Sequence, residues 1–147
     1  MNKIIDIPSP IDLKYPLHAT QWAKEANLKR PYRIEFFEYY ISQILNHPKP
    51  DVRILELGSG PGFFAHELLS RRANIHYTAV DFSAAMHDLA KQRLAAIPHT
   101  SVDFIIADFK QLDWHTVLNG QSLSNANFRD IRIGLEIDGL CTLQATL

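Results

Sequence analysis

The stretch from Val52 to Phe64, VRILELGSGPGFF, decides how the rest of the chain is organised. Its first half is an apolar run typical of a β-strand, and its second half has a glycine at every second position. The glycines at 58, 60 and 62 let the backbone turn sharply and leave room for a ligand to approach it. The stretch therefore predicts a strand, a tight turn and the start of a helix. We expect the amides that open this helix to lack internal partners and to point outward toward polar or anionic ligand groups.

Length and composition bound the class of protein. The 147 residues predict one domain with a substantial core. Apolar residues make up 46% and charged residues 21%, which is typical of a globular protein and excludes a disordered one. The net charge of -1 shows no electrostatic sign of a nucleic-acid or anionic-membrane partner. A single cysteine, Cys141, excludes an intrachain disulfide framework and a multi-cysteine metal site, which suits a reducing compartment.

The N-terminal sequence MNKIIDIPSP carries an acid and two prolines where a signal peptide needs an uninterrupted apolar core. No apolar run approaches the roughly 20 residues that a membrane-spanning helix requires. We therefore expect a cytoplasmic protein.

Residues 1–50 are expected to form an arm and helices that cover the site. The prolines within residues 1–17 predict an extended arm, Thr20 is a candidate cap for a helix to about residue 27, and Pro31 suits the first residue of a second helix. Apolar residues at helical spacing predict the buried stripe of this second helix: Ile34, Phe37, Ile41, Ile44 and Leu45. A cluster of aromatic residues accompanies the stripe and fits core packing better than a substrate pocket: Phe36, Phe37, Tyr39 and Tyr40.

After the glycine turn, helices and strands alternate. The pattern predicts a helix over residues 63–72, a strand over 75–80, a helix over 84–96 capped by Ser83, and a strand over 102–107. This alternation predicts an α/β fold: a Rossmann-like parallel sheet with helices on both sides.

Acids stand at the ends of the second and third predicted strands. Because ligands of open α/β sheets bind at the carboxyl ends of the strands, Asp81 is placed to accept hydrogen bonds from both hydroxyls of a ribose. Asp108 is placed to accept from an exocyclic amine such as that of adenine. Phe82, Met86 and Phe109 are near enough in sequence to sandwich a flat base.

The glycine pattern narrows the choice of nucleoside cofactor. The dinucleotide fingerprint has its third glycine at the position of Phe63, so the NAD pattern fails here. Instead, ELGSGPG resembles the first motif of the class I S-adenosylmethionine-dependent methyltransferases, which is an acid, any residue and then alternating glycines. AVDFSAAM looks like the second motif of that family, and the resemblance covers residues 51–114.

The resemblance implies S-adenosyl-L-methionine as cofactor and a role for each matching residue. Asp81 would hold the ribose hydroxyls, Phe82 and Met86 would flank the adenine, and Asp108, with Phe109 beside it, would lie at the adenine amino group. The residues implied to surround the methionine part are those of the first motif: Glu56, Gly58, Ser59, Gly60 and Gly62.

No catalytic base stands out, and the catalytic residues stay unassigned. Four histidines lack metal-ligand spacing, so no metal site is expected: His66, His76, His87 and His115. Trp114 and His115 follow the third strand, where folding over the cofactor and ordinary packing are both open.

The pattern changes after residue 118. Residues 131–138 alternate apolar and polar, which describes a strand with one wet face and not the buried parallel strand expected beside residues 52–57. Asp138 and Gly139 between two alternating runs predict a two-residue β-hairpin. We expect a truncated or altered methyltransferase domain, with residues 51–118 as the cofactor-binding half and 119–147 atypical. Its uncovered sheet edge would favour a homo-oligomer.

The leading hypothesis is an S-adenosylmethionine-dependent methyltransferase whose acceptor is unidentified, with a small molecule favoured. The alternatives are a non-catalytic module that binds S-adenosylmethionine or a nucleoside, and an NAD-dependent oxidoreductase, which Phe63 disfavours.

Overall fold

The computed structural model of the chain describes residues 11–48, 50, 52–98, 101–111, 113, 114 and 116, together with three two-residue strands between 132 and 141. Its order of elements begins with two helices and continues with alternating strands and helices. Within these described ranges, no helix is both long and apolar enough to cross a bilayer.

The first helix, α1 (Pro16–Lys29), begins earlier than expected. The predicted cap at Thr20 is wrong, because Thr20 lies within the helix and Tyr15 is the residue before its first turn. Pro16 opens the helix because its fixed φ suits the first helical position and its missing N–H has no partner to lose there. The part of the predicted arm over residues 1–10 lies outside the described residues.

The second helix, α2 (Arg33–Leu45), begins two residues after Pro31. Ile41 and Ile44 of the predicted stripe are buried, but Ile34 is 55% exposed and Arg33 is buried in its place. The aromatic cluster is divided as well, since Phe36 and Tyr39 are exposed while Phe37 and Tyr40 pack against the core.

Strands β1 (Val52–Leu57), β2 (Ile75–Asp81) and β3 (Ser101–Ile106) form a parallel sheet in which β2 lies between β1 and β3. Ile54 is opposite Tyr77, and Glu56 is opposite Ala79. The predicted Rossmann-like parallel sheet is confirmed, with each of these strands within about one residue of its expected bounds.

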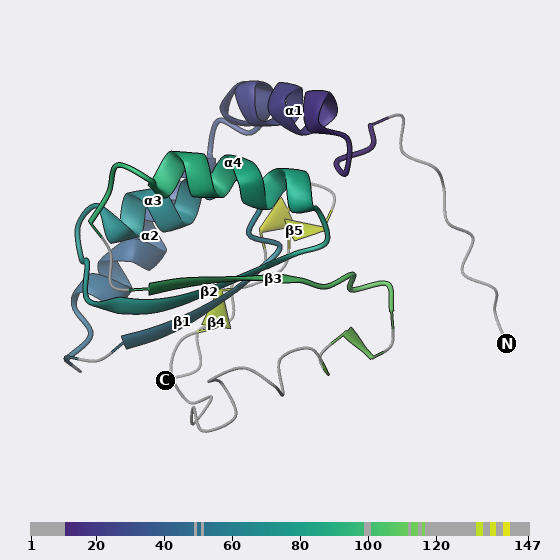
Figure 1. Cartoon of the computed structure of the whole chain (residues 1–147). Helices are drawn as coiled ribbons and strands as arrows, with labels where there is room; N and C mark the ends of the chain where they lie inside the picture. The colour runs from purple at the N-terminus through teal and green to yellow at the C-terminus, as the bar shows by residue number, and fades with distance from the viewer. Residues whose placement is uncertain are drawn as a thin grey trace, which may run out of the picture.

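The helices α3 (Phe63–Leu69) and α4 (Ala84–Leu94) connect these strands. The expectation of helices on both sides is wrong for the described part, because α1 to α4 all lie on one side of the sheet (Figure 1). Two right-handed crossovers that move the chain in the same direction across the sheet put both connecting helices on the same face. On that face α2 and α3 cover Val52 and Ile54, and the ring of Phe37 meets that of Phe64 edge to face at 5.3 Å.

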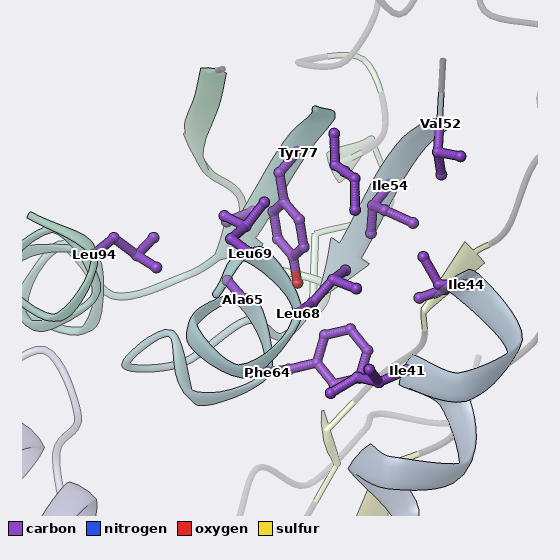
Figure 2. Packing of buried hydrophobic residues seen from close by; sticks show 12 residues of the cluster. Ile41, Ile44, Val52, Ile54, Phe64, Ala65, Leu68, Leu69, Tyr77 and Leu94 are labelled. Atoms are coloured by element: carbon purple, nitrogen blue, oxygen red, sulfur yellow. The ribbon is translucent and has the colours of Figure 1, made fainter. Parts of the chain in front are cut away.

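The main core lies between this face of the sheet and the helices (Figure 2). Residues 52 and 54 of β1 and residues 75, 77 and 79 of β2 point toward α3, as the period-two alternation of a strand requires. The opposite face carries a smaller cluster in which Leu55, Val80, Ile105 and Ala107 are packed by partly buried neighbours.

A fourth strand, β4 (Arg132–Ile133), pairs in parallel with β1 at Leu55 and Glu56. The expectation that β1 lacks a neighbour on this side is therefore wrong at these two residues. A pairing of two residues is made by backbone groups, so the polar alternation that argued against a buried parallel strand did not exclude it.

The predicted hairpin is confirmed. Strands β5 (Glu136–Ile137) and β6 (Leu140–Cys141) pair antiparallel, with Ile137 opposite Leu140. The predicted turn at Asp138 and Gly139 lies outside the described residues.

Candidate functional site

The carboxyl ends of β1 and β2 meet at the glycine turn. The amides of Gly58 and Ser59 both donate to the carbonyl of Val80, at 2.8 and 3.0 Å. The amide of Gly60 donates to Oδ2 of Asp81 at 2.8 Å, so the turn is fastened directly to the acid that ends β2. The predicted meeting of the turn and this acid at one sheet edge is confirmed.

These bonds occupy amides of the turn that precedes α3, whereas the expectation of open amides concerns the start of that helix at Phe63 and stays a prediction. The amides of Gly58, Ser59 and Gly60 are taken as described, and that of Gly62 donates to the Ser59 carbonyl at 3.4 Å. The sequence did not show this, because the acceptors on β2 come from about 21 residues further along the chain.

Gly62 serves helix packing as well as the turn. Its φ of 79° is left-handed, and a Cβ at this position would lie 2.9 Å from Cβ and 3.0 Å from Cα of Ala90. Only glycine allows α3 and α4 to approach this closely at that conformation. The close-packing role that the dinucleotide fingerprint gives to the position of Phe63 is thus performed one residue earlier.

Asp81 is the buried acid of the site. It is 5% exposed, and its Oδ1 accepts from the Ser83 amide at 3.0 Å while Oδ2 accepts from Gly60. Burial raises the pKa of the Asp81 carboxyl, and amide hydrogen bonds from Gly60 and Ser83 and the nearby His87 oppose that increase. A carboxylate has about four acceptor sites, so Asp81 keeps acceptor capacity for a ligand hydroxyl.

Ser59 supplies a second polar group at the turn. The residue is 6% exposed, and among the described residues its hydroxyl has no hydrogen-bond partner. A buried hydroxyl without a partner is costly and rare, so it indicates a position where a ligand completes the bonding.

Glu56 lies two residues before the turn. Its carboxylate is 7% exposed and accepts a hydrogen bond from the Tyr77 hydroxyl on β2. The side chain points to the helix side of the sheet, in the same row of alternating positions as Ile54. The first motif therefore brings a buried acid to the carboxyl end of β1.

The residues expected to flank adenine differ in their surroundings. Phe82 is partly buried beside the site, and the Lys14 ammonium lies 5.9 Å from its ring centroid. Met86 is 1% exposed in a cluster with Ala19 of α1, so its side chain serves the packing of α1 on α4. A contact between Met86 and a base stays a prediction.

Asp108 and Phe109 follow β3. Oδ1 of Asp108 accepts from the Lys110 amide at 3.0 Å in a local turn, and the residue is partly exposed. Phe109 packs edge to face with Trp114 at 4.8 Å in the cluster on the opposite face of the sheet. The base sandwich of Phe82, Met86 and Phe109 and the role of Asp108 therefore stay predictions. Trp114 packs, and His115 lies outside the described residues.

The chain is similar to known proteins in both sequence and fold. Residues 54–122 match the family described as Methyltransferase domain. A malonyl-[acyl-carrier protein] O-methyltransferase of Bacillus cytotoxicus is 34% identical over 90 residues, which are 57% of this chain and 29% of that relative. A crystal structure from Methanococcus maripaludis, provisionally named an S-adenosyl-L-methionine-dependent methyltransferase, superposes with a TM-score of 0.51 at 17% identity. Residues 54–122 are therefore similar to a methyltransferase domain, and the structure has the class I methyltransferase fold.

The chain matches only part of the length of each of these two proteins. The chain spans 29% of the length of the Bacillus relative and 48% of the Methanococcus protein, and the structural match covers 73% of this chain. At 17% identity the structural likeness shows the fold, so the activity of this chain needs its own argument.

Arg33 is a feature of the domain that the sequence analysis missed. The residue is 8% exposed, and its guanidinium carbon lies 4.4 Å from the ring centroid of Phe63, the first residue of α3. Arg93 of α4 lies 4.0 Å from the same ring and donates to the Pro61 carbonyl at 3.0 Å. Two cations thus adjoin the glycine turn. The sequence signal that could have revealed this buried cation is the position of Arg33, two residues after Pro31 and directly before Ile34 of the predicted apolar stripe.

Two other buried polar side chains were missed. Tyr77 occupies an apolar row of β2, where only a buried acceptor justifies its hydroxyl. His87 is 2% exposed, and its Nε2 is 2.9 Å from the Ile105 carbonyl oxygen. Neither residue has a sequence spacing that reveals its partner, because both partners lie on neighbouring strands.

Proposed function

We propose that the chain binds S-adenosyl-L-methionine and transfers its methyl group to an acceptor. The observation that carries this proposal is the meeting of the Asp81 carboxylate and the buried Ser59 hydroxyl at the end of β1, beside a turn held by glycines. The match of residues 54–122 to a methyltransferase domain and the class I fold support the same conclusion.

The residues fit the proposed cofactor. Asp81 has acceptor capacity for the two ribose hydroxyls, and hydrogen bonds to a carboxylate contribute roughly 1.5–3 kcal/mol each when well made. The Ser59 hydroxyl lacks a partner among the described residues and is matched by a polar group of the methionine part. The carboxylate of that part would be attracted by the buried cation of Arg33 next to Phe63.

The mechanism requires mainly positioning. The bound cofactor supplies a methyl group on a positively charged sulfur, which is already activated for transfer. The chain contributes a rigid edge of strands and a buried set of polar groups that fix the cofactor and exclude water. No described side chain stands out as a base, so we expect the acceptor to supply its own nucleophilic atom.

The acceptor is proposed as a small molecule, on the basis of the net charge of -1. The relative's name specifies a malonyl-[acyl-carrier protein], but 29% of that relative is shared and the acceptor does not carry over with it. Association through the edge of β1 likewise stays a proposal, with β4 already paired at Leu55 and Glu56.

Titration calorimetry of the purified chain tests the binding step. We expect S-adenosylmethionine and S-adenosylhomocysteine to bind and NAD not to bind. NAD binding alone would overturn the proposal and favour an oxidoreductase. Transfer of labelled methyl groups from the cofactor to small molecules of a cell extract then separates an enzyme from a binding module. Tight binding without any transfer would favour the non-catalytic alternative.

A further inference from the structure

A buried pair of polar side chains joins β1 to β2 beneath α3. The hydroxyl of Tyr77 donates to Oε2 of Glu56, and the two residues are 1% and 7% exposed. The register explains the contact: Tyr77 is opposite Ile54, and Glu56 is two positions further along β1 on the same face. The tyrosine side chain therefore reaches forward along the sheet, toward the glycine turn.

The surroundings of the ring are apolar. Figure 2 shows the Tyr77 ring among Ile54, Ala65, Leu68 and Leu69, with its oxygen inside the packed cluster beside Leu68. A phenylalanine would fill this volume equally well, and a hydroxyl buried without a partner is destabilising. The hydroxyl is therefore explained by the carboxylate that it meets.

The same bond has a consequence for Glu56. Burial disfavours the charged form of a carboxyl group, and a donated hydrogen bond favours it. A phenol that donates to a carboxylate also restricts the direction in which the remaining lone pairs point, and such charge-assisted bonds are stronger than neutral ones. Tyr77 thus holds one oxygen of the Glu56 carboxyl group in place, two residues before Gly58.

We propose that Tyr77 is a positioning residue of the cofactor site, which holds the Glu56 carboxylate as the acceptor for the ammonium group of the cofactor's methionine part. This inference rests on the proposed function. It assigns the pair a task in ligand binding, beyond the mutual satisfaction of two buried groups. Tyr77 itself does not touch the ligand.

Two ligands separate these roles. S-Adenosylhomocysteine carries the amino-acid group, whereas 5′-methylthioadenosine carries the adenosine and the sulfur without it. We expect Tyr77→Phe to weaken S-adenosylhomocysteine at least about tenfold and to change 5′-methylthioadenosine less than about twofold, as measured by calorimetry. Tyr39→Phe, at a tyrosine that is 61% exposed on α2, is the matched control and should alter neither affinity.

A double-mutant cycle completes the test. Glu56→Gln should weaken S-adenosylhomocysteine selectively, and adding Tyr77→Phe to it should cause little further loss, because Tyr77 acts through Glu56. If Tyr77→Phe does not fold, Glu56→Gln is used to compare the losses of S-adenosylhomocysteine and 5′-methylthioadenosine. This variant should fold, because its amide oxygen still accepts the hydrogen bond from Tyr77.

The outcomes are distinguishable. Equal loss of both ligands in Tyr77→Phe, or no loss of either, would overturn the positioning role while leaving the proposed function intact. If neither adenosyl ligand binds the wild-type chain, the proposed function fails and the role of Tyr77 fails with it.

Discussion

At the scale of single residues, Ser59 separates ligand binding from stability. Its buried hydroxyl lacks a partner among the described residues, so the free protein has no hydrogen bond to lose there. We predict that Ser59→Ala leaves the free energy of unfolding unchanged or raises it by up to about 1 kcal/mol, because an unsatisfied group is removed. The affinity for S-adenosylmethionine should fall about three- to tenfold. Urea unfolding and calorimetry measure the two effects, and destabilisation without loss of affinity would contradict the assignment.

Asp81 makes adenosine binding depend on pH. Burial raises the pKa of its carboxyl, and ribose hydroxyls donate to its charged form. Proton binding therefore competes with the ligand, and the affinity for 5′-methylthioadenosine should fall as the pH drops through the raised pKa. We expect the decline to begin above the pH at which an ordinary aspartate protonates. Titrations from about pH 7.5 down to about pH 4.5 test this, and a constant affinity over that range would count against Asp81 as the ribose acceptor.

The raised pKa of Asp81 also makes the stability of the free protein depend on pH. A carboxyl whose folded pKa exceeds its unfolded value binds more protons in the folded state, so its contribution to stability falls as the pH rises from the unfolded value through the folded one. The charged Asp81 carboxylate therefore lowers the free energy of unfolding of the ligand-free protein at neutral pH. Hydrogen bonds donated by a ligand would offset this loss.

At the scale of elements, Gly62 sets the distance between α3 and α4. We predict that Gly62→Ala destabilises the chain by roughly 2–4 kcal/mol, because the new Cβ meets the Ala90 backbone and the residue keeps a left-handed φ. Ser59→Ala is a control in the same turn and should cause no destabilisation. Thermal unfolding compares them, and equal melting temperatures would show that the helices separate without cost.

Ser83 joins α4 to the segment before α1. Its Oγ accepts from the Met86 amide at 3.1 Å and donates to the Leu13 carbonyl, and the residue is fully buried. We predict that Ser83→Ala costs roughly 1–3 kcal/mol, from the lost cap and the orphaned carbonyl. The matched control is Ser70→Ala, at an exposed serine that donates to the His66 carbonyl and should change stability by less than about 0.5 kcal/mol. Chemical unfolding of both variants checks the difference.

The elements near the glycine turn were predictable for physical reasons. The strand β1, the glycine turn after it and the cap at Ser83 depend on residues that are adjacent in the sequence. They could therefore be predicted without knowledge of tertiary contacts. The start of α1 was missed because three prolines looked like one extended arm, although Pro16 is well suited to the first turn of a helix.

At the scale of the whole molecule, the sequence indicated the parallel sheet but not its surroundings. Which face the helices cover follows from the direction of the crossovers, and the pairing of β4 follows from backbone contacts of two residues. In the site, too, features set by the local sequence were predicted and features set by strand pairing were not. Asp81 was found because it ends a strand, whereas the bonds that close the turn amides and join Tyr77 to Glu56 depend on register between strands.

The central claim is that an adenosyl cofactor binds where Asp81 meets the glycine turn. The most direct test is the affinity for S-adenosylhomocysteine of the wild-type chain and of Asp81→Asn, which keeps an acceptor oxygen for one of the two amides. Asp103→Asn, at an exposed aspartate of β3, is the matched control. The account predicts a loss of at least about tenfold, or roughly 1.4 kcal/mol, for Asp81→Asn and none for Asp103→Asn. Undiminished affinity in a folded Asp81→Asn would contradict it.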